Sequence, residues 1–347
     1  MIKFGLIGCG HWGKNYIRVL KELDTSYLLA CCDSSEQKLQ DLRLIHKDLD
    51  FFTDYRKILE NKDIETIVVA TPPSSHYSIV KDCLKSGKHV IAEKPLTLKV
   101  DECQTLFDLA NKKGLQLLVG YTFLYNTAIQ KLKNYIEDGS LGKVYYFHST
   151  RTHLGLVRQD INAVWDLAPH DISIFLYLLN EVPKAVSATG ACYLQKGKED
   201  VAFISLQFDS GIIGNIHISW VNSNKVREVQ IIGENARIIF DDLNNFEKVR
   251  IFKKRIERTP DNLTFSEFQN KNTSSFAEFQ YILRDGDIIS PYINLSEPLK
   301  EQSRFFIRCI KENTSLYEQE QMNITITKVM CSITESLLKG GALVEIF

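Results

Sequence analysis

The chain of 347 residues lacks the features that mark several classes of protein. No apolar run approaches the roughly 18 residues of a membrane-spanning helix, and the N-terminus enters a strand pattern instead of a signal peptide. We therefore expect a cytoplasmic protein with no membrane partner. Lys and Arg total 42 against 43 Asp and Glu, a net charge of −1, so no excess of positive charge points to nucleic acid as a partner.

Metal-site and disulfide patterns are absent as well. The eight cysteines form no C-x-x-C pair and no zinc-ligand spacing, and most lie in apolar stretches, where a thiol behaves as a small hydrophobic side chain. We expect no metal. Internal repeats and low-complexity segments are lacking too, and the length with 44% hydrophobic residues is enough for two domains with separate cores.

The N-terminal segment carries a glycine pattern typical of dinucleotide binding. A strand pattern over residues 2–7 leads into a helix pattern through the motif Gly8-Cys9-Gly10-His11-Trp12-Gly13. In such a motif Gly8 makes the tight turn, Gly10 admits a pyrophosphate, and Gly13 lets the helix pack closely on the strand. The first N–H groups of the helix would bind that pyrophosphate, so His11 and Trp12 are predicted to contact the cofactor.

Asp33 favours NAD as the cofactor. It ends a second apolar run, twenty residues after Gly13, where a carboxylate accepts hydrogen bonds from the adenosine ribose and repels a 2′-phosphate. Two serines follow it, with no arginine to pair with a phosphate. Lys38 or Arg43 could still approach, so NADP remains the less favoured alternative.

Strand and helix patterns alternate up to about residue 122, which predicts a Rossmann domain with a doubly wound parallel sheet over residues 1–122. Residues 123–347 predict an α+β domain with one large, mostly antiparallel sheet. Its expected strands are residues 144–150, 185–191, 201–208, 212–220, 225–232, 236–241, 248–253 and 343–346. Its expected helices are residues 127–138, a helix through 172–179, 299–311 and 322–338. Residues 255–298 are polar and give no assignment.

Two short segments carry groups suited to proton and hydride chemistry. Glu93-Lys94-Pro95 follows a predicted strand at the carboxyl edge of the sheet, where Lys94 could polarise a substrate hydroxyl; an ordinary exposed lysine at a strand exit fits equally. Asp166 is predicted to cap a helix with Pro169 in its first turn, so that Asp166 and His170 share a face. The helix dipole would keep His170 neutral and able to accept a proton. A simple cap and a packed histidine are the alternatives.

Five motifs in this order resemble the Gfo/Idh/MocA family, which includes glucose–fructose oxidoreductase and inositol dehydrogenase. They are Gly8-x-Gly10-x-x-Gly13, Ala70-Thr71-Pro72-Pro73-Ser74-Ser75-His76, Glu93-Lys94-Pro95, Gly139-x-x-Gly142 and Asp166-x-x-x-His170. The resemblance implies an NAD-dependent oxidoreductase with Lys94, Asp166 and His170 as its catalytic group. It places Thr71, Pro72, His76 and Glu93 along the cofactor, and it implies a homodimer or homotetramer formed through the C-terminal sheet.

The substrate class expected from the resemblance is a sugar or nucleotide sugar. Residues 165–171, with Arg151 upstream and residues 225–227 downstream, are more similar to members of nucleotide-sugar metabolism than to inositol dehydrogenases. A diphosphate would need cationic partners, and those available are Arg151, Arg158, Lys225 and Arg227. Tyr125 and Asn126 are further candidate substrate residues. Free-sugar or inositol dehydrogenases, an enzyme that retains its NAD, a redox-assisted glycoside hydrolase and a non-catalytic dinucleotide sensor of the same fold remain alternatives.

Overall fold

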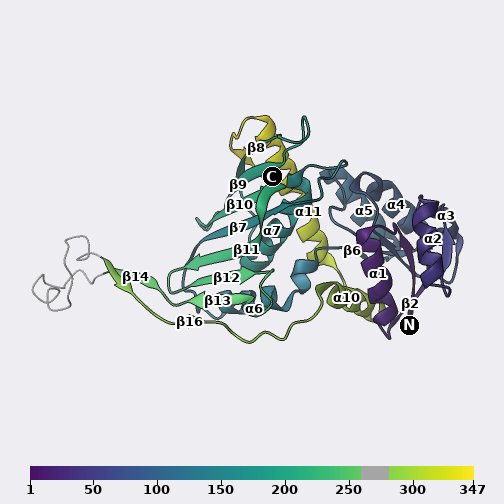
Figure 1. Cartoon of the computed structure of the whole chain (residues 1–347), viewed down its shortest axis with the longest axis horizontal. Helices are drawn as coiled ribbons and strands as arrows, with labels where there is room; N and C mark the ends of the chain where they lie inside the picture. The colour runs from purple at the N-terminus through teal and green to yellow at the C-terminus, as the bar shows by residue number, and fades with distance from the viewer. Residues whose placement is uncertain (259–280) are drawn as a thin grey trace, which may run out of the picture.

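The computed structural model describes residues 1–258 and 281–347, and its N-terminal part is a parallel sheet with helices on both faces (Figure 1). The strands are β1 (Ile2–Ile7), β2 (Ser26–Cys32), β3 (Asp50–Phe52), β4 (Thr66–Val69), β5 (His89–Ala92) and β6 (Leu117–Val119). Their order is β3-β2-β1-β4-β5-β6, and every neighbouring pair is parallel. The predicted doubly wound sheet is confirmed.

The helices between these strands are α1 (His11–Glu22), α2 (Glu36–Ile45), α3 (Arg56–Glu60), α4 (Pro73–Lys85) and α5 (Val100–Lys113). Helix α5 ends where Gly114 adopts φ 63°, a left-handed conformation that glycine takes at little cost. The strand order reverses between β1 and β4, so a crevice opens at their carboxyl ends. Both the glycine motif and residues 70–76 follow strands that end at this crevice.

The second part of the chain forms a nine-stranded sheet. Its strands are β7 (Val144–Leu154), β8 (Ala185–Ala191), β9 (Val201–Gln207), β10 (Ile213–Ser219), β11 (Val221–Gly233), β12 (Arg237–Asp241), β13 (Val249–Phe252), β16 (Ile288–Ile289) and β17 (Val344–Glu345). The order is β16-β13-β12-β11-β7-β10-β9-β8-β17. Among these described strands only β7 and β10 pair in parallel, so the prediction of a mostly antiparallel sheet is confirmed.

The remaining elements are the 3-10 turn η1 (Thr122–Tyr125), α6 (Thr127–Glu137), α7 (Ala163–Leu179), α10 (Pro298–Glu312), α11 (Tyr317–Leu338) and the two-stranded ribbon β14 (Arg255–Arg258) with β15 (Tyr281–Arg284). The ribbon lies in the segment that the sequence left unassigned, which also falls partly outside the described residues. Strand β11 begins four residues before its predicted start, because Val221 still pairs with Leu154 ahead of an irregularity that ends at Val226.

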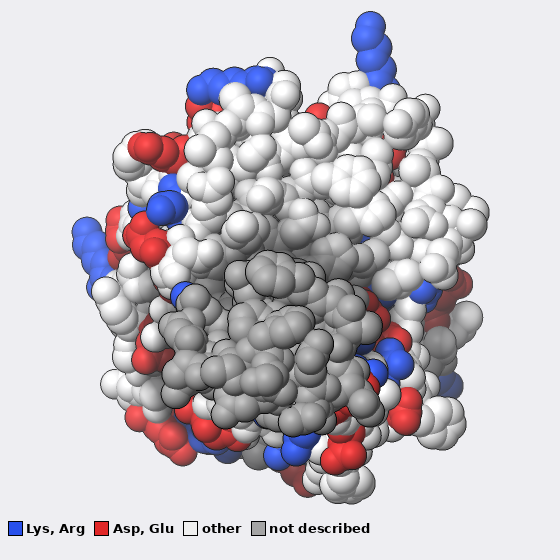
Figure 2. All heavy atoms as spheres, turned by 90° about the vertical axis from the view of Figure 1, so that its left-hand side faces the viewer, with Lys and Arg blue, Asp and Glu red and all other residues white. Residues whose placement is uncertain are grey.

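Helices α7 and α11 cover one face of the large sheet, and no helix in the described part of the chain covers the other face. Buried and more exposed residues alternate along β7, β9 and β10, with Phe147, Ile204 and Ile216 buried toward the helices. Figure 2 shows the end of the molecule that carries this sheet, and charged side chains of both signs are visible around the margin of the view. Uncharged side chains dominate the upper part of that view.

Helix α10 returns to the N-terminal part of the molecule. Phe306 and Ile307 pack into the same core as Phe4 and Leu20, and the Gln302 amide donates to the buried Tyr16 hydroxyl at 3.1 Å. Because α10 contributes to the N-terminal core, residues 1–122 do not contain the whole of that core. The domain division after residue 122 therefore stays a prediction. Among the described residues, no helix is long and apolar enough to cross a membrane.

Candidate active site

The crevice at the carboxyl ends of β1 and β4 contains a cavity of about 660 Å³. Its walls include most of the residues predicted to contact a dinucleotide: Gly8, Gly10, His11, Trp12, Asp33, Thr71, Pro72, Glu93 and Lys94. The glycine geometry fits a pyrophosphate. A Cβ on Gly10 would project into open space, where the cofactor backbone is expected, whereas a Cβ on Gly13 would lie 2.0 Å from the carbonyl oxygen of Gly8. Gly13 therefore serves close packing, and Gly10 keeps the approach to the helix N-terminus clear.

The Asp33 carboxylate is held in place at the end of β2. It accepts hydrogen bonds from the backbone N–H groups of Cys9 and Ser35, both at 2.9 Å. Lys38 lies 3.4 Å from it and also lines the cavity, whereas Arg43 pairs with Glu36. Of the two cations that the sequence left open as phosphate partners, Lys38 is therefore the one that lines the cavity beside Asp33.

His76 supports the cavity from behind instead of lining it. The residue is fully buried, and its ring nitrogens lie 2.7 Å from the Thr71 carbonyl oxygen and 2.8 Å from that of Pro95. It thus ties the loop after β4 to the loop after β5, where the Lys94–Pro95 peptide bond is cis. Thr71 and Pro72 themselves face the cavity.

Glu93 is a buried carboxyl group in the cavity wall, and burial raises its pKa to about 7 against the opposing charge of Lys94. The Tyr16 hydroxyl lies close to the Glu93 carboxyl group, and Glu93 Oε1 has no hydrogen-bond partner among the described residues. Tyr16, which lies beside this carboxyl, and Gln302, which donates to the Tyr16 hydroxyl, were not identified from the sequence. Tyr16 had the spacing of a core residue, and the contact to Gln302 spans 286 positions.

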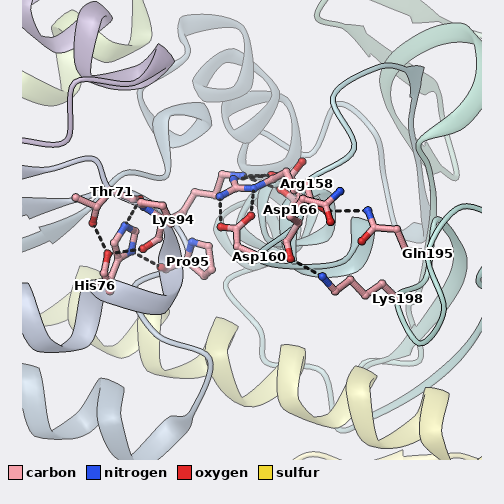
Figure 3. A network of polar contacts seen from close by, with 12 residues as sticks. Thr71, His76, Lys94, Pro95, Arg158, Asp160, Asp166, Gln195 and Lys198 are labelled. Atoms are coloured by element: carbon pink, nitrogen blue, oxygen red, sulfur yellow. Dashed lines mark hydrogen bonds and ion pairs between the residues drawn. The ribbon is translucent and has the colours of Figure 1, made fainter. Parts of the chain in front are cut away.

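A second cavity of about 700 Å³ adjoins the first. Five residues line both cavities and so form the boundary between them: His11, Trp12, Lys94, Arg158 and Asp166. The Lys94 ammonium donates to the Asp166 backbone carbonyl at 2.7 Å and lies 3.2 Å from Asp166 Oδ1 (Figure 3). Burial opposes ionisation of Asp166, but the charges of Lys94 and Arg158 outweigh it and hold its pKa below the usual value. Lys94 and Asp166 therefore meet as an ion pair at the junction.

Helix α7 begins earlier than predicted, which corrects the proposed role of Asp166 as a cap. The cap is Asn162, whose side chain accepts from the Trp165 N–H at 3.0 Å. Asp166 is the fourth residue of α7, and Pro169 lies inside the helix, where it removes the donor that would reach the Trp165 carbonyl. The asparagine was overlooked because the helix was predicted from the apolar residues at Ile172 and beyond, although Ala163 to Trp165, ahead of Asp166, are apolar and buried.

His170 is accordingly too far into α7 for the helix dipole to act on it, since that effect falls off within the first turn. Burial is the main cause that lowers the pKa of His170 well below its usual value, and the charges of Lys94, Arg151 and Arg227 add to it. The residue lines the second cavity, packs edge-on against Phe123, and has no described partner for Nδ1. A neutral His170 therefore results, for a different reason from the one predicted.

The predicted substrate residues divide into two groups. Arg151, Arg227 and Asn126 line the second cavity with Lys94 and His170. Tyr125 instead packs against Phe305 of α10, with ring centroids 5.4 Å apart, and Lys225 is exposed outside both cavities.

The two arginines also differ in their partners. The Arg151 guanidinium makes two hydrogen bonds to Asp171, at 2.8 and 2.9 Å, and only 5% of its side chain is exposed. The side chain of Arg227 is 40% exposed and lies 3.6 Å from Asp242. Asp171, the buried partner of Arg151, was not identified from the sequence, because its position next to His170 gave no sign of a contact to β7. Within residues 1–258 and 281–347, no group of His, Cys, Asp and Glu side chains is placed to hold a metal ion.

Comparison with known proteins gives the family. Residues 2–121 match the model of the Gfo/Idh/MocA oxidoreductase family with an NAD-binding Rossmann fold, and residues 129–239 match the model of the C-terminal domain of that family. A myo-inositol 2-dehydrogenase from Thermotoga maritima is 25% identical over 257 residues, 70% of this chain and 76% of that protein. A UDP-N-acetylglucosamine 3-dehydrogenase from Acidithiobacillus ferrooxidans is 25% identical over 245 residues, 70% of this chain and 75% of that protein.

Among solved structures, the WlbA dehydrogenase from Bordetella pertussis in complex with NADH and UDP-GlcNAcA superposes with a TM-score of 0.80. At 20% identity over 100% of this chain and 98% of that chain, this likeness shows the shared fold. Two family models that together span most of the chain, on a Rossmann sheet followed by a large open sheet, show that it belongs to the Gfo/Idh/MocA oxidoreductase family.

Proposed function

We propose that this protein transfers a hydride between a nicotinamide dinucleotide and a secondary hydroxyl, or the corresponding ketone, of a sugar or nucleotide sugar. The observation that carries the proposal is the position of Lys94, Asp166 and His170. Lys94 and Asp166 line both cavities, and His170 lines the second. A group that polarises oxygen and a group that accepts a proton therefore stand where the two ligands would meet.

In the direction of oxidation, the dinucleotide supplies the acceptor for the hydride that leaves the carbon. The residues of the chain handle the oxygen and its proton. His170, kept neutral by burial and nearby cations, accepts the hydroxyl proton. Lys94 donates a hydrogen bond to the same oxygen and stabilises the negative charge that develops on it. Asp166 holds Lys94 in place. Lys94 as the base and His170 as the electrophile is the second assignment compatible with these contacts.

The preferred cofactor is NAD. The Asp33 carboxylate is fixed at the end of β2 by two backbone N–H groups, where it would accept from a ribose diol and repel a 2′-phosphate. Lys38 already pairs with Asp33 at 3.4 Å, so that carboxylate would compete with a 2′-phosphate for its ammonium group.

A nucleotide sugar is favoured over a free sugar by the charge of the second cavity. Arg227 is half-exposed in its wall and reaches Asp242 only at 3.6 Å, so its guanidinium is the more accessible partner for a diphosphate. The relative that acts on UDP-N-acetylglucosamine and the complex with UDP-GlcNAcA support this class. Because another relative is an inositol dehydrogenase, a free polyol is the alternative substrate class, and the test includes it.

A homo-oligomer is also part of the proposal. On β7, β9 and β10 the outward side chains of the sheet face opposite α7 and α11 are largely uncharged: Tyr146, His148, Thr150, Phe203, Ile213 and His217. An apolar and uncharged face of this kind suits contact with a second copy. Light scattering after gel filtration that shows only monomer would contradict this part. The free thiols of all eight cysteines fit the cytoplasm as the compartment.

The test is a turnover screen of nucleotide sugars, free hexoses and inositols with NAD and with NADP. Lys94→Ala and His170→Ala should each lower turnover on the best substrate by about 10²-fold or more, because each removes a positioned acid–base group. NADH affinity should stay nearly unchanged. His46→Ala is the matched control, since His46 lies in the N-terminal part outside both cavities. A tightly bound dinucleotide without turnover on any substrate would instead favour the sensor.

A further inference from the structure

The loop between β7 and α7 carries a second cation to the boundary of the two cavities. This residue is Arg158, and contacts from the turn between β8 and β9 hold its backbone in place. Gln195 Nε2 donates to the Arg158 carbonyl at 3.0 Å, and the Lys198 ammonium donates to the carbonyl of Gln159 (Figure 3). The loop is therefore anchored at the point where Arg158 leaves it.

The guanidinium is shared between two carboxylates. Its Nε and Nη2 donate to the two oxygens of Asp160 at 2.9 and 2.6 Å. Its Nη1 lies 3.4 Å from Asp166 Oδ1, the same oxygen that lies 3.2 Å from Lys94 Nζ. One carboxylate oxygen of Asp166 thus stands between two cations, as Figure 3 shows.

Arg158 also lies at the boundary between the two cavities, beside Lys94 and Asp166. Lys94 and Arg158 are the two Lys or Arg side chains common to both cavity walls, as far as the structure describes the chain. The side chain of Arg158 is 30% exposed, against 17% for Asp166 and 7% for Lys94. The charges of this cluster balance as two cations and two carboxylates in a largely enclosed place.

We propose that Arg158 is a positioning residue of the active site: it keeps Asp166 ionised and shares its Oδ1 with Lys94, which fixes how the Lys94 ammonium presents its protons to substrate. The inference rests on the proposed function for the part that concerns turnover. Loss of Arg158 would leave Lys94 as the cation in contact with Asp166, with Arg151 and His153 of β7 acting on it from farther away. The cluster would lose one positive charge, which favours protonation of Asp166.

A role for Arg158 as a ligand of a substrate diphosphate is the rival explanation. Its Nε and Nη2 edge, the one suited to a bidentate contact, already binds Asp160. A phosphate would have to displace that carboxylate, whereas Arg227 presents a more exposed guanidinium to the same cavity.

The test compares Arg158→Gln, Arg158→Lys and Lys198→Met through the pH profile of kcat/KM on the best substrate of the screen. In Arg158→Gln, the fall of kcat/KM toward acid pH should begin about one pH unit higher than in the wild type, because one of two charges next to Asp166 is gone. Arg158→Lys should restore most of the difference. Lys198→Met, which loosens the loop but leaves both cations beside Asp166, should leave the acid limb in place.

A second measurement does not depend on turnover. The measurement uses the Asp160→Asn protein without dinucleotide, so that the Asp160 carboxylate no longer contributes to the pH dependence. In this background, the melting temperature is compared with and without Arg158→Gln from pH 3 to pH 7. An Asp whose pKa is lowered by folding contributes stability above its unfolded pKa, which is lost as pH falls through the folded one. The difference in melting temperature between the two proteins should therefore be largest at pH 6 to 7 and disappear toward pH 3.

Parallel melting curves at every pH, together with an unmoved acid limb, would overturn the assignment. An Arg158→Gln variant that raises KM for a nucleotide sugar ten- to a hundredfold, with the acid limb unmoved, would show a phosphate ligand instead. Should no substrate turn over, the melting curves still decide the role of Arg158, so the failure of the proposed function remains separate.

Discussion

Replacement of the buried Glu93 by glutamine should make the protein more stable in alkaline solution and not in acid. Burial raises the pKa of Glu93 from 4.5 to about 7, and each pH unit corresponds to about 1.4 kcal/mol. The ionised form therefore costs the fold about 3 kcal/mol. For an acid whose pKa is raised by folding, this stability is fully present below pH 4.5 and is lost as pH rises through about 7.

Glutamine has nearly the same shape but does not ionise, so Glu93→Gln removes this dependence on pH. We expect the two proteins to have similar free energies of unfolding at pH 5, and the variant to be more stable by about 3 kcal/mol at pH 9. Urea unfolding at pH 5, 7 and 9, without dinucleotide, measures the difference directly.

Glu60→Gln is the matched control, because the side chain of Glu60 is 64% exposed and its replacement should not change the pH dependence. Parallel stability curves for Glu93→Gln and the wild type would refute the reasoning. Such a result would mean that Glu93 ionises in the fold without penalty, through a partner or water that the cavity supplies.

Three further predictions follow from the contacts of the two cavities. NADH should bind at least about tenfold tighter than NADPH, and Asp33→Ser should reduce this difference in affinity by freeing Lys38 for the 2′-phosphate. Fluorescence titration measures both affinities, and tighter NADPH binding by the wild type would contradict the prediction. Arg151→Ala should destabilise the fold by about 3–5 kcal/mol, because it leaves Asp171 buried and unpaired; urea unfolding measures this, and a neutral effect would be the contrary result. Arg227→Ala should barely change stability but raise KM for a nucleotide sugar about ten- to a hundredfold with little change in kcat; an unchanged KM in steady-state kinetics would remove the support for a diphosphate.

The sequence by itself determined the class of fold and the order of most of its elements. The glycine motif, the buried strands and the alternating strands after residue 184 can be recognised from the local spacing of residues. This is possible because side chains on one face repeat every 2 residues in a strand and every 3.6 residues in a helix. The family and its NAD-binding Rossmann domain could also be predicted, because the motifs lie in a fixed order along the chain. The start of α7 was missed, since the helix was predicted from Ile172 onward and the apolar residues that follow the capping Asn162 were not assigned to it.

Tertiary structure alone decided which charges meet. The ion pair of Lys94 with Asp166 joins positions 72 apart, and Arg151 contacts Asp171 across 20 residues of loop and helix. The neutrality of His170 arises from burial and three cations instead of its own helix, and the raised pKa of Glu93 arises from its burial beside Tyr16, 77 positions away in the sequence. Electrostatic interactions and desolvation depend on distance and enclosure in space, and neither is written in the spacing of residues along a sequence.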